Sequence, residues 1–307
     1  MSLFYGQKVV KKIHTVLTYL MNEQRKGVLN YKKIMAMEKI IKNKELQTLY
    51  QPILNLESGK NLGYEILNRP FKSSLFPTTE KFYDFIGESD QVCAFEFFCR
   101  NLSLQRCSQL IRNIPFKRNT LLFINMTPQA LVELTHQIDE LLFLLEQYDL
   151  TPNQIVFELT EKREFTDFEN FRQSMACYRE QGFRIALDDV GAGYNSLKTL
   201  IYLKPDFIKI DKSLIQNIDQ NKSQQQMVKL LLDFANESNM YVISEGIERL
   251  EEYNYLRMKG IHYGQGYGLG RPASELCPGK VPVERYLPRS LTSFHYLPNQ
   301  LLNMGDV

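Results

Sequence analysis

Seven short apolar runs in this chain each end at a polar side chain that can bind a cation or form a hydrogen bond. In a closed barrel of mostly parallel strands, the apolar part of each strand fills the interior and the strand ends meet at one rim. The polar residues at the ends of these runs are Glu65, Asn125, Glu158, Asp188, Lys209, Glu245 and Gln265. The sequence therefore predicts a barrel with one shared polar rim, and such a rim is suited to metal binding.

The order of the expected elements indicates an α/β fold. From about residue 37, short β-rich runs alternate with longer helical patterns at 128–148, 165–181, 225–239 and 250–259. Strands that alternate with helices of this length indicate βα units and parallel pairing. The first two strands, expected at 48–57 and 62–68, are instead joined by Glu57-Ser58-Gly59-Lys60, which is a hairpin signal. One strand should therefore run antiparallel.

Composition limits the class of protein. The 307 residues, 44% of them hydrophobic and 23% charged, accommodate one α/β barrel of about 250 residues with extensions. A formal net charge of +2 without a long block of one sign indicates no binding of a DNA or RNA polymer, although a local basic pocket could take a small anion. The five cysteines show no zinc spacing and are expected to be reduced, mostly buried thiols of a cytosolic protein.

Two segments flank the expected barrel at 37–275. Within an amino-terminal helical extension at 1–36, residues 7–24 carry apolar side chains at helical spacing, which fits a helix docked on the barrel and a signalling or dimerising helix equally well. Residues 276–307 are expected to form a carboxy-terminal arm, irregular from Pro282 onward. Without a run of eighteen apolar residues or a secretory signal, the chain as given is expected to be cytoplasmic and to contain no membrane span.

Asp188 and Asp189 are adjacent carboxylates at the end of an apolar run. Two carboxylates in a concave site repel each other, so such a pair often indicates a bound cation. The alternative is an Asp-Asp turn that caps a helix, which the following Gly191 and Gly193 would suit. Capping is the better reading of the pair in isolation, and the other strand ends favour a metal.

Oxygen donors at neighbouring strand ends specify the kind of cation. Glu158 and Asn125 each end an apolar run, and together with Glu65 and Asp188 they form an all-oxygen set without His or Cys nearby. Such a set selects a hard cation, Mg²⁺ or Mn²⁺, over zinc. The alternative for Asn125 is a buried amide that satisfies backbone groups.

Lys209 and Glu245 are candidate catalytic groups. Lys209 lies two residues before Asp211, so on an alternating strand both side chains face the barrel mouth. A lysine among carboxylates can stabilise phosphoryl charge or orient a water, and its alternative role is an internal salt bridge with Asp211. Glu245 is a candidate metal ligand or general base, or else part of a strand-to-helix cap.

Eight ordered motifs in this chain closely resemble those of the EAL domain. They are Tyr50-Gln51-Pro52-Ile53, Glu65-Ile66-Leu67-Asn68-Arg69, Asn125-Met126-Thr127, Glu158-Leu159-Thr160-Glu161, Asp188-Asp189-Val190-Gly191-Ala192-Gly193-Tyr194, Lys209-Ile210-Asp211, Glu245-Gly246-Ile247-Glu248 and Gln265-Gly266-Tyr267. A single short match is weak evidence, but eight in order make a chance resemblance negligible. The resemblance covers about residues 37–275. It implies a modified TIM (β/α)8 barrel and a cyclic di-GMP phosphodiesterase, a hydrolase whose product is linear pGpG.

The resemblance also implies roles for individual residues. Two cations, Mg²⁺ or Mn²⁺, would be held by Glu65, Asn125, Glu158, Asp188, Asp189 and Glu245, with Asp188 shared between them. The implied catalytic residues are Lys209, Glu245 and Glu161, of which Glu161 would anchor the loop after Asp189. The implied substrate-binding residues are Gln51, Leu67, Arg69, Asp211 and Gln265. Because that loop contributes to dimer contacts in the family, a homodimer is expected.

This chain departs from the usual family motifs without losing a ligand. Ile66 replaces the signature alanine, and on an alternating strand its bulk should enter packing rather than the metal site. Val190, Ala192 and Asn195 replace a usual phenylalanine, threonine and serine, which could weaken loop anchoring and lower activity. Two alternatives to the hydrolase therefore stay open: a cyclic di-GMP receptor without turnover, and a barrel enzyme that acts on another phosphorylated metabolite.

Overall fold

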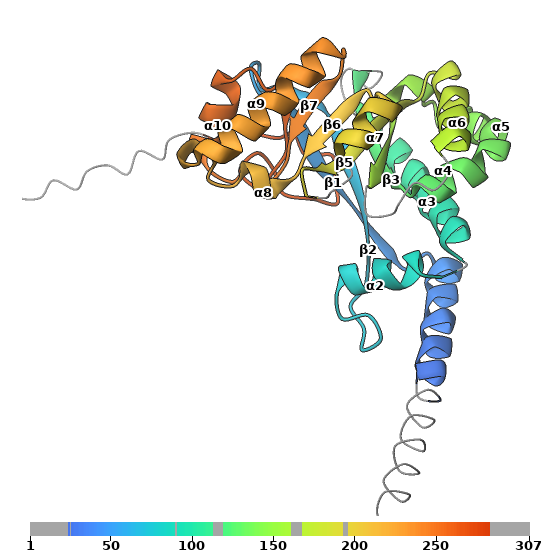
Figure 1. Ribbon diagram of the computed structural model, residues 1–307. Helices are drawn as coiled ribbons and strands as arrows, with labels where there is room; N and C mark the ends of the chain where they lie inside the picture. Colours follow the sequence, from blue (N-terminus) through green and yellow to red (C-terminus); the bar gives the residue numbers. More distant parts are fainter. Residues whose placement is uncertain are drawn as a thin grey trace, which may run out of the picture.

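Eight strands close into a barrel in their order along the chain (Figure 1). The computed structural model describes residues 24, 26–89, 91–112, 119–160, 168–192 and 196–282. The strands are β1 (Leu46–Asn55), β2 (Asn61–Pro70), β3 (Leu121–Met126), β4 (Ile155–Thr160), β5 (Arg184–Val190), β6 (Phe207–Ile210), β7 (Tyr241–Ser244) and β8 (Tyr263–Gly264). β1 is antiparallel to both β2 and β8, and the other neighbours pair in parallel. The expected α/β barrel with one antiparallel strand is confirmed.

Helices connect the strands and cover the outside of the barrel. A helix at 26–43 precedes β1. The other α-helices are α2 (Thr79–Gly87), α3 (Val92–Ile111), α4 (Pro128–Leu134), α5 (Ile138–Gln147), α6 (Phe168–Glu180), α7 (Ser196–Leu203), α8 (Lys212–Ile215), α9 (Lys222–Glu237) and α10 (Leu250–Met258). Short 3-10 turns include η2 (Thr135–Gln137), η3 (Pro152–Gln154) and η4 (Ile218–Gln220). Sequence reasoning missed α2 and α3, although Thr78 is an N-cap whose hydroxyl accepts a hydrogen bond from Lys81 N–H.

The single helix expected at 128–148 is wrong, because the structure breaks it into α4, η2 and α5. The break falls at Thr135, whose hydroxyl donates to the Leu131 carbonyl at 2.9 Å. Such back-bonding from a threonine competes with the helical backbone and bends helices. The apolar periodicity continues across the bend, so the sequence pattern alone does not reveal it.

Strand alternation separates the barrel interior from the helical layer. Phe123, Val156, Ala186, Phe207 and Ile243 share one buried interior cluster. Since side chains repeat with a period of two, the inward position two residues further along each of these strands lies nearer the carboxyl end of the barrel. Those positions are Asn125, Glu158, Asp188 and Lys209, and Glu245 directly follows β7 at the same spacing. The same alternation that fills the core therefore delivers the polar residues to the mouth.

The opposite faces of the strands pack against the helices. Ile66, Ile124, Phe157, Leu187 and Ile208 belong to this larger outer core. Each fully buried side chain of this size contributes about 1.5–3 kcal/mol relative to an exposed one. Ile66 is 3% exposed, which confirms that its extra bulk enters packing rather than the site.

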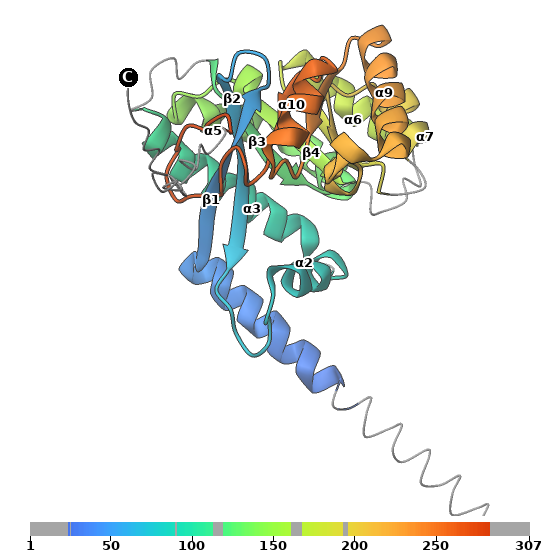
Figure 2. The same ribbon diagram turned by 90° about the vertical axis from the view of Figure 1, so that its left-hand side faces the viewer.

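β1 and β2 extend past the barrel and support a separate apolar cluster. In Figures 1 and 2 their far ends reach α2 and the helix at 26–43, away from the other strands. Met37, Leu46, Phe82 and Phe95 are among the residues of this cluster. Arg106 on α3 joins it to the barrel by donating to the Leu46 carbonyl at 2.5 Å and to the Thr48 hydroxyl at 2.9 Å. The amino-terminal helix is thus packed onto the same strand pair that carries Glu65.

The five cysteines are free, and the expectation that most are buried is wrong. Cys107 is buried, Cys93 and Cys99 are half-buried, and Cys177 and Cys277 are exposed. Cys177 is on α6 and Cys277 follows the last strand, at positions where a small side chain is not needed to fill the core.

Other sequence-based expectations fall at the edges of the described chain. The helix predicted at 7–24 lies outside it except for residue 24, and the irregular arm lies outside it except for Pro282. Among the described residues, no helix is both long enough and apolar enough to cross a bilayer.

His262 should make stability depend on pH. Its Nδ1 accepts a hydrogen bond from Val242 N–H at 3.1 Å, and burial lowers the pKa of the imidazole. The unfolded chain then binds more protons than the folded chain between the lowered pKa and about 6.5, so stability falls as the pH falls through that window. The variant His262→Asn keeps a hydrogen-bond acceptor but has no group that titrates in this range. Between pH 8 and pH 5, we expect its unfolding free energy, measured in urea, to fall by less than that of the wild type. Parallel losses would contradict this.

Candidate active site

A buried lysine lies at the centre of the barrel mouth. Lys209 Nζ is 2.7 Å from Glu245 Oε1, 2.8 Å from Glu158 Oε1, 3.2 Å from Asp188 Oδ1 and 3.6 Å from Glu65 Oε2. The carboxylates come from β2, β4, β5 and the residue after β7, so positions far apart in sequence meet at one point. The lysine and Glu158 are both 0% exposed. The structure thus brings together five of the residues predicted from the strand ends.

Three amide side chains surround Glu65. Gln265 Nε2 donates to Glu65 Oε2 at 2.5 Å and to Gln51 Oε1 at 3.2 Å. Asn125 Nδ2 donates to Glu65 Oε1 at 3.2 Å, and Gln51 Nε2 donates to the Gly270 carbonyl at 3.1 Å. These bonds fix the orientation of the Glu65 carboxylate. The side-chain oxygen of Asn125 is not used as the acceptor in its bond to Glu65, so it can serve as a ligand.

A second group of carboxylates lies beside the first. One oxygen from each of Asp188, Asp189 and Glu245 lies within 4.8 Å of the others. Successive residues of a regular strand point to opposite faces, but the β5–β6 register shifts between Leu187 and Val190, and Asp189 has φ 55°. This local irregularity allows both aspartates to face the same site. It also explains why a simple period of two does not account for Asp189.

Burial and mutual repulsion shift the pKa values of the clustered carboxylates, and the single positive charge of Lys209 opposes those shifts. Burial raises the pKa of Glu158 well above its ordinary range, although Lys209 opposes the shift. Burial likewise raises the pKa of Asp188, and raises that of Glu245 to about 8. Burial acts in the same direction on Glu65, but Lys209 and the hydrogen bonds from Gln265 and Asn125 outweigh it and lower its pKa. Glu65 is therefore the carboxylate best prepared to remain ionised.

The residues present fit a hard divalent cation. Glu158 Oε2 is buried without a hydrogen-bond partner in the described part of the chain, whereas Glu158 Oε1 and Asp188 Oδ1 face the Lys209 ammonium at 2.8 and 3.2 Å. Buried acceptors of this kind are costly unless something satisfies them. Carboxylate and amide oxygens are the donors that Mg²⁺ and Mn²⁺ prefer. The unpartnered Glu158 oxygen, the crowding of carboxylates around one ammonium and the donor chemistry therefore all favour cation binding at this mouth.

The predicted substrate-binding residues occupy different parts of the rim. Leu67 and Arg69 follow Glu65 at intervals of two on β2, so all three side chains lie on one face of the strand. Both are half-buried and lie beyond Ile66, the last β2 residue that pairs with β3. Gln51 and Gln265 are buried beside Glu65. Glu161 lies outside the described residues.

The expected position of Asp211 on the strand is wrong. β6 ends at Ile210, and Asp211 is the N-cap of α8, where its Oδ1 accepts a hydrogen bond from Ser213 N–H at 2.9 Å. The alternative role of Lys209, a salt bridge with Asp211, is also wrong. The ion pairs of Lys209 within the described chain are with the four carboxylates above. The polar side chain of Asp211 begins the helix, because an N-cap carboxylate satisfies a free N–H.

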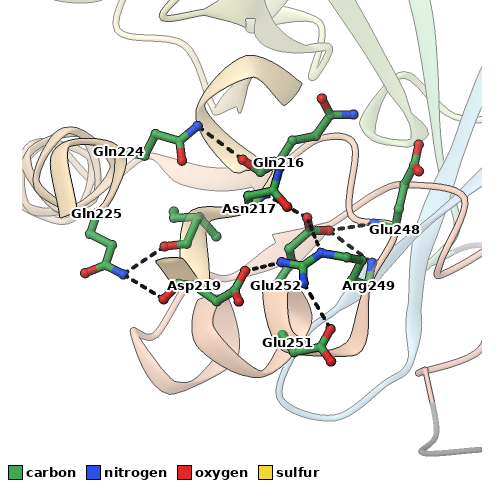
Figure 3. Close-up of polar contacts among 10 residues, drawn as sticks. Gln216, Asn217, Asp219, Gln224, Gln225, Glu248, Arg249, Glu251 and Glu252 are labelled. Atoms are coloured by element: carbon green, nitrogen blue, oxygen red, sulfur yellow. Dashed lines mark hydrogen bonds and ion pairs between the residues drawn. The ribbon is translucent and has the colours of Figure 1, made fainter. Parts of the chain in front are cut away.

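The loop that starts at Glu245 is fastened by a carboxylate of α10 (Figure 3). Glu252 is 2% exposed, and its Oε2 accepts the N–H groups of Glu248 and Arg249, both at 3.0 Å. Its Oε1 accepts Asn217 N–H at 2.9 Å, from the turn before η4. Glu252 therefore connects the loop after β7 to the segment that follows β6, and these two segments adjoin Glu245 and Lys209.

Arg249 adds contacts to Glu252, and Gly246 lets the loop after β7 pass close to α8. Arg249 Nε donates to Glu252 Oε1 at 3.1 Å, and its guanidinium also pairs with Asp219 and Glu251 (Figure 3). Gly246 has φ 72°, and a Cβ there would lie 2.4 Å from the Cβ of Lys212. The loop thus passes so close to α8 that a side chain at this position would require one of them to move. Sequence reasoning missed Glu252, although a glutamate at the third position of a helix is a capping signal.

Removing the Glu252 carboxylate should lower the stability of the protein. Glu252→Ala leaves three backbone N–H groups and a guanidinium without their acceptor, so we expect a loss of about 3 kcal/mol in unfolding free energy. Glu252→Gln keeps an acceptor oxygen and should lose less. The neighbouring exposed Glu251→Gln is the matched control and should match the wild type. Equal stability of Glu252→Ala and Glu251→Gln in urea unfolding would contradict the fastening role.

A family model described as the EAL domain matches residues 35–272. This match covers most of the chain and contains every site residue described above. The chain belongs to the EAL domain family. The resemblance found in the sequence motifs is therefore confirmed.

Individual EAL proteins support the same assignment. The probable cyclic di-GMP phosphodiesterase PdeB of Escherichia coli K12 is 29% identical over 233 residues, which cover 75% of this chain and 43% of PdeB. A standalone EAL protein from Vibrio cholerae O395, solved with c-di-GMP, has a TM-score of 0.66 at 26% identity and covers 76% of this chain and 95% of that one. Klebsiella pneumoniae BlrP1, solved with calcium and cyclic di-GMP, also has a TM-score of 0.66 at 26% identity, with coverage of 77% and 58%. BlrP1 has also been solved with manganese and cyclic di-GMP.

The similarity to curated relatives does not extend over their whole length. This EAL chain spans less than half of PdeB and of PdeG, the next relative, at 43% and 49% of their lengths. The family match at residues 35–272 contains the barrel and its mouth. Within it, the departures from the usual motif leave the described carboxylates in place, since Val190 is buried in the outer core and Ala192 is exposed.

Proposed function

We propose that this EAL protein hydrolyses cyclic di-GMP to linear pGpG, with two divalent cations, Mg²⁺ or Mn²⁺, bound at the barrel mouth. The observation that carries the proposal is the convergence of Glu65, Glu158, Asp188 and Glu245 on one buried ammonium, next to Asp189. Membership of the EAL family and the cyclic di-GMP complexes of structural relatives support the choice of substrate.

The charge of the cluster supports a pair of cations. If all five carboxylates are ionised, five negative charges and the one positive charge of Lys209 leave a net charge of −4, which two divalent cations balance. Such a pair of cations activates water at neutral pH and stabilises the charge on the attacking and leaving oxygens of a phosphodiester.

The carboxylates divide into two proposed ligand sets. Glu65, Asn125, Glu158 and Asp188 are assigned to one cation, and Asp188, Asp189 and Glu245 to the other. The hydrogen bonds of Glu65 keep its carboxylate ionised and oriented for the first set. The three-carboxylate group whose oxygens lie within 4.8 Å of one another provides the second. Asp188 is shared because it faces Lys209 beside Glu65 and Glu158 and also belongs to the three-carboxylate group.

Proton handling and charge stabilisation are assigned to Lys209 and Glu245. Lys209 stays protonated because the surrounding carboxylates raise its pKa despite burial, so it can position a water or a phosphate oxygen. Burial raises the pKa of Glu245 to about 8 before any cation binds, and a bound cation would lower it again, so that the ionised carboxylate could accept a proton from a water as general base. Glu161 is proposed to anchor the loop after Asp189.

The substrate is proposed to lie along β2 and across the rim. Arg69 is suited to a phosphate because its guanidinium can donate two parallel hydrogen bonds. Leu67 offers an apolar surface to a guanine base, and Asp211 lies at the start of α8, close to the site in sequence. Gln51 and Gln265 orient Glu65 and line the buried side of the mouth.

Incubation of the purified protein with cyclic di-GMP and Mn²⁺ tests the proposal. Formation of pGpG, measured by chromatography and lost in Glu65→Ala, is the expected result. Tight binding without product would instead assign the protein as a cyclic di-GMP receptor. Absence of cyclic di-GMP binding, together with binding of a phosphorylated metabolite that Glu65→Ala weakens, would show that the substrate is another compound.

Two further properties belong to the proposal. A homodimer is expected, and analytical ultracentrifugation of the full chain measures it directly. A cytoplasmic location is also proposed, in line with the expectation drawn from the sequence. No DNA or RNA polymer is proposed as a partner.

A further inference from the structure

The net charge of +2 conceals a strong separation of charge along the chain. Residues 1–44 contain ten lysines and arginines and two acidic residues. Because the totals are 37 basic and 35 acidic residues, the remaining 263 residues contain 27 basic and 33 acidic side chains, a net charge of −6. Such asymmetry between parts of a chain indicates that the basic part meets an anionic partner.

The described part of this basic region is the helix at 26–43, which projects away from the barrel (Figure 2). One side of the helix packs against the body through Met37, which is 1% exposed, with Ile40 and Ile41 beside it. Val28, Tyr31 and Met35, in contrast, are 57%, 64% and 46% exposed. These residues are spaced by three and four positions, so they form one stripe on the side opposite Met37.

Exposed lysines border this apolar stripe. Lys32 lies four residues after Val28, and Lys39 lies four residues after Met35, which makes each pair neighbours on the helix surface. Between residues 26 and 44 there are six lysines and a single acidic residue, Glu38. A helix with apolar side chains on its free side and lysines along the border has the composition of an interfacial membrane helix.

We propose that the outward side of the helix at 26–43 docks in the interface of an anionic lipid bilayer. The lysines would contact lipid phosphates while Val28, Tyr31 and Met35 enter the boundary between headgroups and acyl chains. A second copy of the helix fits less well, because its lysines would face lysines of like charge. A nucleic acid would use the lysines but leave the apolar stripe exposed to water. The proposal is independent of the proposed catalytic activity.

Vesicle sedimentation with the full chain tests this docking. The probes are vesicles of phosphatidylcholine alone and of phosphatidylcholine mixed equally with phosphatidylglycerol. We expect binding to the anionic vesicles that weakens with added salt, and little binding to the neutral ones. A Lys32→Glu, Lys39→Glu double variant should bind at least about tenfold more weakly. A Val28→Ser, Tyr31→Ser double variant should lose binding even at low salt.

Matched controls are available on the barrel. Lys222→Glu and Met258→Ser replace an exposed lysine and an exposed methionine far from this helix in the sequence, and should leave vesicle binding unchanged. Failure to bind anionic vesicles, or equal losses in the controls, would overturn the proposal. A second copy of the chain would be the partner instead if the wild type does not bind vesicles and ultracentrifugation shows that it is a dimer while the Val28→Ser, Tyr31→Ser variant is a monomer. That result would also overturn the proposal. Equally tight binding to duplex DNA that does not need Val28 and Tyr31 would also overturn it.

Discussion

Glu158→Gln is expected to abolish most cyclic di-GMP hydrolysis while leaving the fold intact. The substitution keeps the shape of the side chain but removes the charge of a proposed metal ligand. Since changes to the outer partners of a metal ligand already cost up to about 100-fold, loss of a ligand charge should cost at least that much. Turnover measured by pGpG formation at saturating Mn²⁺ checks the size of the effect.

The stability of Glu158→Gln separates a ligand from a structural residue. Glu158 is fully buried beside Glu65 and Asp188, and it shares the single Lys209 ammonium with three other carboxylates, so its charge destabilises the metal-free protein. Thermal unfolding in EDTA should therefore occur at the same or a higher temperature than in the wild type. Glu169→Gln on α6, where Glu169 is exposed and pairs with Arg172, is the control and should keep full activity. Full activity of Glu158→Gln would exclude its role as a ligand.

Lys209→Met is expected to have the largest effect on the stability of the metal-free protein. The Lys209 ammonium is within 3.6 Å of four buried or half-buried carboxylates, and methionine leaves them without a counter-charge. Removing one partner from a buried ion-pair network costs about 3–5 kcal/mol. Urea unfolding in EDTA at pH 8 should show a loss of this size.

Divalent cations and acid should both reduce this loss. Saturating Mn²⁺ supplies positive charge to the same carboxylates, so the difference from the wild type should shrink. Lower pH should also shrink it, because burial already raises the pKa of Glu158, Asp188 and Glu245, and protonation removes their repulsion. Lys229→Met is the matched control, since Lys229 pairs with Asp233 on the exposed side of α9. A loss in Lys209→Met that ignores both cations and pH would contradict the electrostatic explanation.

The proposal of cyclic di-GMP hydrolysis and the proposal of membrane docking can fail independently of each other. Hydrolysis depends on carboxylates at the carboxyl ends of the strands, whereas vesicle binding depends on a helix that precedes β1. Variants of Val28 and Tyr31 should therefore keep turnover in solution, and Glu158→Gln should keep vesicle binding. A protein that binds anionic vesicles and hydrolyses cyclic di-GMP would carry out this chemistry at a membrane surface.

The strands and the polar residues at their ends were predictable because both depend on local periodicity. An apolar run that ends at Asn125 or Glu158 specifies a buried strand, and in parallel strands those ends must meet on one side of the sheet. Ile66 could be placed in the helical layer for the same reason, because it neighbours Glu65 on an alternating strand. The hairpin before it follows from the turn at 57–60.

Other features depend on contacts between distant residues. Asp211 continues the strand period in the sequence, but it follows the end of β6 and caps α8, where its carboxylate accepts a hydrogen bond from the Ser213 N–H. The bend at Thr135 arises from one side-chain hydrogen bond inside a continuous apolar pattern. Glu252 has its role only because folding brings the turn at Asn217 to the start of α10.

The sequence by itself determined the barrel class, the EAL family and the residues that line the mouth, because periodicity and motif order are local properties of the chain. Only the tertiary structure decided that Lys209 pairs with four carboxylates rather than with Asp211, and that both Asp188 and Asp189 face one site. It also decided that the amino-terminal helix carries an apolar stripe on its free side. These outcomes follow from which surfaces become buried when distant segments pack, and burial sets the energies of charges and apolar groups alike.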